Sequence, residues 1–119
     1  MAREKRREQR LSHGFYMRVL DESTHALLGY ISQVSQRGFR LDCLKPLPVE
    51  KDYTLRLEYT SVVEDKPYII FTARVVWCRP DEIIPNEYYA GFTITAISTF
   101  DQGIYQGIVE KYGKFEHKW

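Results

Sequence analysis

Two short groups of polar residues have types and spacing suited to binding an anionic ligand. The first is the run Arg6-Arg7-Glu8-Gln9-Arg10. A guanidinium group pairs through two hydrogen bonds with phosphate or with the O6 and N7 edge of guanine, and it also stacks on bases. The second is Gln33-Val34-Ser35-Gln36-Arg37-Gly38. In a strand Gln33 and Ser35 would share a face, and Gly38 would allow positive φ and close approach of the backbone to a ligand.

Signatures of catalysis and of metal binding are missing from the sequence. The histidines His13, His25 and His117 lack the spacing of a metalloprotease helix, and there is no nucleophile elbow and no phosphate loop. Cys43 and Cys78 are too far apart in sequence to form the paired ligands of a zinc site. We therefore expect no enzyme, no metal and no cofactor. The two cysteines are expected to be buried, reduced thiols.

Charge divides the chain into an arm and a body. Residues 1–10 hold five basic side chains against two glutamates, a net charge of +3, while the whole chain of 119 residues carries +1. The body is therefore mildly acidic at −2. The length predicts one domain, with residues 1–12 as a flexible basic arm and 13–119 as the folded part. No apolar run is long enough for a membrane span or a signal peptide, so a cytoplasmic location is expected.

Alternating apolar residues predict six strands in the body. The expected strands cover 15–19, 26–34, 38–43, 54–60, 69–77 and 90–96, separated by polar turns. Residues 79–87 are expected to form a loop. Six strands with short turns, followed by one helix, predict a mainly β fold: a closed six-stranded antiparallel barrel of the split-barrel type, with the helix packed on it.

The last segment is expected to be that helix, over about 99–113. Ser98 and Asp101 resemble a capping box, and Gly113 is expected to end the helix. Phe100, Ile104, Ile108 and Tyr112 recur every four residues, which predicts one apolar face for core packing or for a dimer contact. Gly103 and Gly107 are expected to let the helix pack closely on the barrel.

Trp77 has two interpretations. It ends the alternating series of residues 69–77 that is expected to face inward. The indole would then fill the mouth of the barrel as a core residue, or it would act as a platform on which a base stacks.

The two polar motifs, in this order, resemble the PilZ domain family. The family pattern is Arg-x-x-x-Arg followed by Asp/Asn-x-Ser-x-x-Gly, and the surrounding segments GYISQVSQRGFRL, TARVVW and YAGFTI resemble its second and third, fifth and sixth strands. The resemblance covers most of residues 6–97. It implies a receptor or adaptor for cyclic di-GMP, with motility, biofilm formation and adhesion as the associated processes. The ligand-binding residues that it implies, together with the possible stacking platform, are Arg6, Arg7, Arg10, Gln33, Ser35, Gly38 and Trp77.

One residue departs from the family pattern. Gln33 stands where the family has Asp or Asn, and a neutral amide accepts less strongly from guanine N–H groups than a carboxylate does. The alternative function is therefore a degenerate PilZ-like module that binds a protein and not cyclic di-GMP. Binding of single-stranded nucleic acid is a third interpretation, disfavoured by the acidic body. The sequence does not identify the effector protein or distinguish a monomer from a dimer.

Overall fold

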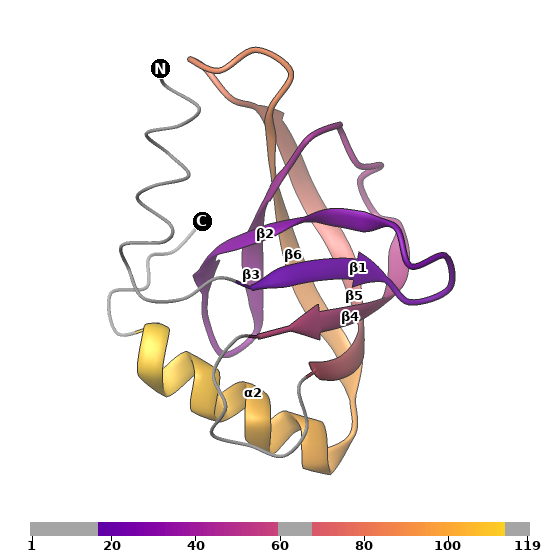
Figure 1. The fold of residues 1–119 in the computed structure, drawn as a ribbon, viewed down its shortest axis with the longest axis vertical. Helices are drawn as coiled ribbons and strands as arrows, with labels where there is room; N and C mark the ends of the chain where they lie inside the picture. The colour runs from indigo at the N-terminus through magenta and orange to yellow at the C-terminus, as the bar shows by residue number, and fades with distance from the viewer. Residues whose placement is uncertain (1–16, 60–67, 114–119) are drawn as a thin grey trace.

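The structure is a computed structural model that describes residues 17–59 and 68–113 (Figure 1). Within these ranges it contains six strands and one helix: β1 (Arg18–Asp21), β2 (Leu27–Val34), β3 (Gly38–Cys43), β4 (Asp52–Glu58), β5 (Tyr68–Pro80), β6 (Tyr88–Ile97) and α2 (Thr99–Tyr112). The strands form a closed barrel in the order β1-β2-β3-β6-β5-β4, with every pair antiparallel. The predicted barrel and C-terminal helix are confirmed.

The barrel closes because each strand has one apolar face. Side chains that alternate along the strands fill the interior, and the rings of Phe39 and Phe92 stack there with centroids 4.9 Å apart. Phe71 meets Phe39 edge to face at 5.7 Å. Pairing of β1 with both β2 and β4 then leaves neither end of the sheet as a free edge.

The prediction for the inward face of β5 is wrong at Trp77. Ile69, Phe71, Ala73 and Val75 are buried in the barrel as expected. The register then shifts between Val75 and Trp77, so that Trp77 pairs with Gly91. One extra residue in a strand moves the following side chains to the opposite face. Trp77 therefore lies on the outside of the barrel, half-buried, and does not fill its core.

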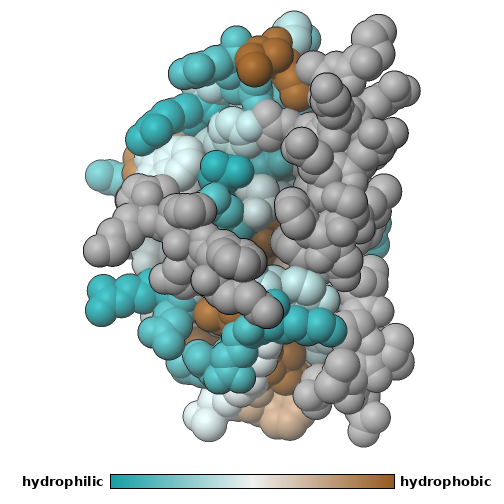
Figure 2. Space-filling model, turned by 90° about the vertical axis from the view of Figure 1, so that its left-hand side faces the viewer, coloured by the Kyte–Doolittle hydropathy of each residue, from teal (hydrophilic) through white to brown (hydrophobic). Residues whose placement is uncertain are grey.

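Strands β5 and β6 are also longer than the sequence predicted. Arg79 and Pro80 belong to β5, although a loop was predicted from 79 to 87. The two strands form a long hairpin that rises above the barrel in Figure 1. Ile83 in the connecting loop is 79% exposed, and hydrophobic atoms are visible at the corresponding upper end of the molecule in Figure 2.

The predicted start and end of α2 are confirmed, and so is most of its predicted apolar face, because Ile108 is buried and Ile104 and Tyr112 pack against the core. The Ser98 side chain accepts a hydrogen bond from the Asp101 backbone N–H, and the Gly113 N–H donates to the Val109 carbonyl. The Asp101 carboxylate accepts a hydrogen bond from the Ile70 backbone N–H of β5 at 3.2 Å.

The side of α2 that packs on the barrel carries two side chains with polar groups, Asp101 and Tyr105, which the apolar pattern of the sequence does not include. Its buried residues are Asp101, Tyr105, Ile108 and Val109. Phe100, predicted to lie on this face, is 66% exposed. Gly103 and Gly107 have no neighbouring atoms within 4 Å of where a Cβ would lie, so they are not points of close packing. No helix in the described ranges is long and apolar enough to cross a membrane.

Candidate ligand-binding face

Four residues line up across the outside of the barrel. Gln33 of β2 pairs with Arg40 of β3, Arg40 pairs with Gly91 of β6, and Gly91 pairs with Trp77 of β5. We call this line the Gln33–Trp77 row. Neighbouring strands lie about 4.8 Å apart, so the row extends over about 14 Å. Two site residues that the sequence placed 44 positions apart are thus on one surface.

The indole of Trp77 lies over the backbone of Gly91. A Cβ at position 91 would collide with the indole nitrogen, so a side chain there would displace the ring. The guanidinium of Arg79 lies 4.7 Å from the centre of the Trp77 ring. Trp77 Nε1 is buried and has no hydrogen-bond partner in the described residues. Trp77 is therefore not a core residue of the barrel mouth, and its indole lies against the outer side of β6 at Gly91.

Arg40 is a candidate binding residue that the motif comparison missed. Its Nε donates to the Ser32 hydroxyl at 2.9 Å, and its guanidinium lies 4.6 Å from the centre of the Tyr89 ring. Ser32 lies at the register shift of β2, between Ile31 and Gln33. The alternation of Phe39, Arg40 and Leu41 already indicated that Arg40 points outward. Arg79 was missed because it was predicted to be in a loop.

The second motif forms the hairpin between β2 and β3. Ser35 N–H donates to the Gly38 carbonyl at 2.9 Å, and Gly38 N–H donates to the Ser35 carbonyl at 3.4 Å. The Ser35 hydroxyl donates to the same Gly38 carbonyl at 3.3 Å. The Tyr105 hydroxyl of α2 lies 2.7 Å from both the Ser35 and the Gly38 carbonyl oxygens. Ser35 is therefore held by the hairpin and, through its carbonyl, by the helix.

Gly38 is glycine for a reason other than the one predicted. It does not adopt a left-handed φ, but a Cβ at this position would collide with the Phe92 carbonyl oxygen of β6. The backbone that approaches Gly38 closely is thus the neighbouring strand of the barrel. The predicted positive φ is wrong, and the close backbone contact in the structure is with β6.

The predicted arginine arm, with Arg6, Arg7 and Arg10, lies outside the described residues. The first residue described after it is Met17, whose carbonyl accepts a hydrogen bond from the Ile31 N–H of β2 at 3.0 Å. Met17 thus lies next to Ile31 of β2, two positions before Gln33. Met17 therefore lies beside the Gln33–Trp77 row.

Metal and thiol chemistry have little support in the described part of the chain. No group of three or more metal-ligating side chains is found among these residues. Cys43 and Cys78 are both free, and Cys43 is buried while Cys78 is half-buried. Burial raises the pKa of the Cys43 thiol to about 12, so that thiol stays protonated at neutral pH and is a poor nucleophile.

Comparison with known proteins identifies the family. The model of the PilZ domain matches residues 4–109, which includes both motifs and all six strands. Searches of curated proteins and of solved structures gave no match. PilZ domains are receptor or adaptor domains and not enzymes. The chain belongs to the PilZ family and is a cyclic di-GMP-binding or PilZ-type adaptor domain.

Proposed function

We propose that this protein binds cyclic di-GMP on the Gln33–Trp77 row and acts as a receptor. The observation that supports this most directly is that Gln33, Arg40 and Trp77 lie on one line across four strands of the outer face. A dinucleotide with two guanines and two phosphates needs base platforms, hydrogen-bond partners and cations within one short surface. The row and its neighbours offer each of these groups.

The aromatic and amide groups suit the bases. A guanine stacked on the Trp77 side of the row would gain about 1–3 kcal/mol, although Arg79 must move if the base takes its place over the indole. Gln33 would accept from a guanine N–H through its side-chain carbonyl, and Ser35 would contribute its hydroxyl. Substitution of a carboxylate by this amide is expected to weaken binding by about 1–2 kcal/mol.

The cationic groups suit the phosphates. In the described residues Arg40 and Arg79 contact aromatic rings and form no ion pair with a carboxylate. Arg6, Arg7 and Arg10 would add further cations from the arm, which precedes Met17 beside β2. Micromolar affinity requires only about 8 kcal/mol, which stacking and a few charge-assisted hydrogen bonds would supply.

The arm supplies a signalling mechanism. Ligand phosphates would hold Arg6 and Arg10 against the barrel, and the ordered arm would cover or expose a surface that an effector protein recognises. Hydrogen exchange at residues 1–12 is expected to slow when cyclic di-GMP saturates the protein. Unchanged exchange there would overturn this mechanism while leaving binding itself intact.

Calorimetric titration with cyclic di-GMP tests the binding proposal. We expect heat with the unmodified protein, loss of binding in an Arg10→Ala variant, and unchanged binding in an Arg56→Ala variant. Arg56 lies on another face, where it is paired with Glu22, so this control removes one positive charge without touching the row. Absence of both heat and a thermal shift would favour the second candidate, a degenerate module that binds a protein and not the nucleotide, for which Gln33 is the supporting residue.

A further inference from the structure

Strand β6 extends past the strand that covers one of its edges. The last pair between β3 and β6 is Gly38 with Thr93, and the Ile94 N–H donates to the Arg37 carbonyl at 2.8 Å. After this point the hairpin turns back toward β2. Ala96 and Ile97 pair only with Thr72 and Phe71 of β5. Within residues 17–59 and 68–113, the other edge of β6 therefore has no strand partner over residues 95–97.

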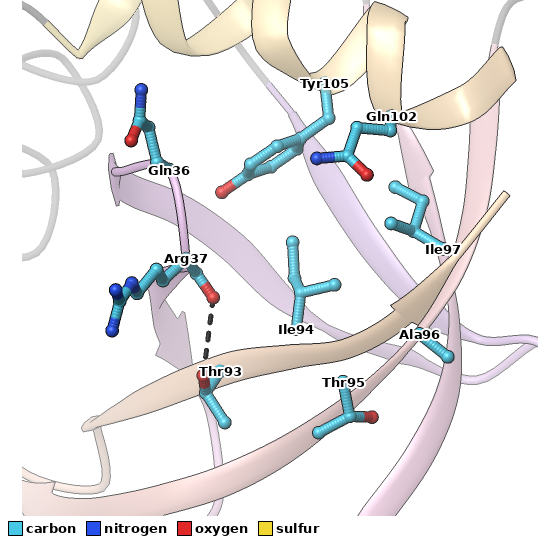
Figure 3. A pocket seen from close by; sticks show the side chains of 9 residues that line it. All are labelled: Gln36, Arg37, Thr93, Ile94, Thr95, Ala96, Ile97, Gln102 and Tyr105. Carbon is cyan, nitrogen blue, oxygen red and sulfur yellow. Dashed lines mark hydrogen bonds between the residues drawn. The ribbon is translucent and has the colours of Figure 1, made fainter. Parts of the chain in front are cut away.

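A slot of about 430 Å³ lies along this edge. Figure 3 shows the tip of the β2–β3 hairpin at one end, β6 along one side and α2 along the other. The residues that line it are Gln36, Arg37, Thr93, Ile94, Thr95, Ala96, Ile97, Gln102 and Tyr105. Five of these are consecutive in β6. Successive side chains of a strand point to opposite faces, so an unbroken run indicates that the backbone edge of the strand lines the slot.

The slot combines an apolar interior with a positive end. Ile94 and Tyr105 approach each other across it in Figure 3, and both pack against the hydrophobic core. Arg37 is exposed at the hairpin tip, and the described residues provide no carboxylate partner for it. None of the described residues that line the slot is acidic. Gln36 and Gln102 add amide groups able to bond a peptide backbone.

We infer that this slot binds an extended, acidic segment of a partner protein by adding a strand to the edge of β6. Backbone groups of the segment would pair with residues 95–97. A small apolar side chain of the segment would pack between Ile94 and Tyr105, and a carboxylate at its end would pair with Arg37. The inference gives the adaptor a docking surface that does not include the Gln33–Trp77 row, and it holds whether or not the protein binds cyclic di-GMP.

The test uses the peptide acetyl-Glu-Val-Thr-Val-Glu-amide. It has a glutamate at each end, so a carboxylate can reach Arg37 whether the peptide lies parallel or antiparallel to β6. It is titrated into the isotope-labelled full chain without nucleotide, and backbone amide signals are followed by NMR. We expect saturable shifts at residues 94–97 and at Arg37. A peptide with lysine in place of both glutamates is expected to bind at least about tenfold more weakly. A peptide N-methylated at its three central residues, which loses those three backbone N–H donors and is too bulky at these nitrogens to pair as a strand, is expected to bind much more weakly.

A charge exchange separates a specific contact from general attraction. The variant Arg37→Glu should lose the acidic peptide and gain the lysine peptide. The variant Lys45→Glu makes the same change of charge at an exposed loop position beyond the other end of β3, and it should bind like the unmodified protein. Three results would overturn the inference: no shift of the amide signals of residues 94–97 at millimolar acidic peptide, equal binding of the N-methylated and the unmethylated acidic peptide, or equal binding of the acidic and the lysine peptide. These results require no cyclic di-GMP, so they are independent of the nucleotide titration.

Discussion

Two outer faces of the barrel differ in whether their arginines are paired with carboxylates, although one arginine of the paired face, Arg56, also lies 4.0 Å from the centre of the Tyr68 ring. On the face formed by β1, β4 and β5, arginine side chains are paired with carboxylates. Arg18 pairs with Glu58 at 2.5 Å, Arg56 with Glu22 at 2.8 Å and Arg74 with Asp52 at 2.8 Å. On the face formed by β2, β3, β6 and β5, Arg40 and Arg79 instead lie over the rings of Tyr89 and Trp77.

The difference determines which face can bind an anion. A guanidinium already bonded to a carboxylate must lose that partner before it can bind phosphate. A guanidinium over an aromatic ring keeps N–H donors free at its edge. The paired face is therefore nearly neutral and structural, and the Gln33–Trp77 row is the face prepared for an anionic ligand. This contrast can be tested by changing matched residues on the two faces.

Among changes on the two faces, the largest expected effect is the loss of nucleotide affinity when Trp77 is replaced. Replacing Trp77 by Ala removes the stacking surface and should raise the Kd for cyclic di-GMP by about 10–100-fold. Trp77→Phe should restore part of the affinity because a flat ring remains. Calorimetry measures the Kd, and thermal unfolding confirms that each variant is folded.

Arg56→Ala is the matched change on the paired face and should leave the Kd within about twofold. If it weakened binding as much as Trp77→Ala did in a folded protein, the distinction between the two faces would be wrong.

An intermediate effect is expected at Gln33. Gln33→Asp supplies the carboxylate of the family pattern, and a charge-assisted hydrogen bond to guanine should lower the Kd by about tenfold. Gln33→Glu, with the same charge but the original length, separates charge from reach. Weaker binding in both variants would mean that position 33 faces a phosphate and not a guanine edge.

The smallest expected effect is the acid sensitivity of the paired face. The hydrogen bond from Arg56 lowers the pKa of Glu22 below its usual 4.5, and that from Arg74 lowers the pKa of Asp52 below its usual 3.8. A lowered pKa in the folded state contributes stability that is present above the usual value and is lost as pH falls through the folded one. The Asp52 side chain is 51% exposed and the Glu22 side chain 27% exposed, so solvent screens both pairs and the contribution is small.

Urea unfolding between pH 6 and pH 3 measures this loss, the range being set by the ordinary carboxylate pKa values of about 4. An Arg56→Ala, Arg74→Ala double variant should lose less stability over the same range than the unmodified protein. Equal losses would show that these pairs do not contribute to acid sensitivity.

Local patterns were sufficient where a structural element depends on its own residues. Alternation predicted the strands, and the Ser98 cap and Gly113 predicted the ends of α2 within one residue. The family motif placed Gln33 and Ser35 at one hairpin. Arg40 could also have been found, because its outward direction follows from the alternation of its neighbours.

Long-range pairing decided the features that the sequence did not predict. The outward position of Trp77 results from a register shift against β6, and a shift depends on both strands. The need for glycine at position 38 comes from the Phe92 carbonyl of β6, 54 positions later in the chain. The sequence did not predict the polar part of the buried face of α2, because Asp101 and Tyr105 bond to backbone groups of β5 and of the β2–β3 hairpin.

The sequence by itself thus determined the order of the elements, the apolar face of each strand and the residues of the two motifs, because these follow from local periodicity and residue chemistry. The tertiary structure alone decided which side chains meet on the outer faces. Neighbours across a barrel are set by register, and register is fixed by packing and hydrogen bonding between strands that are distant in the chain.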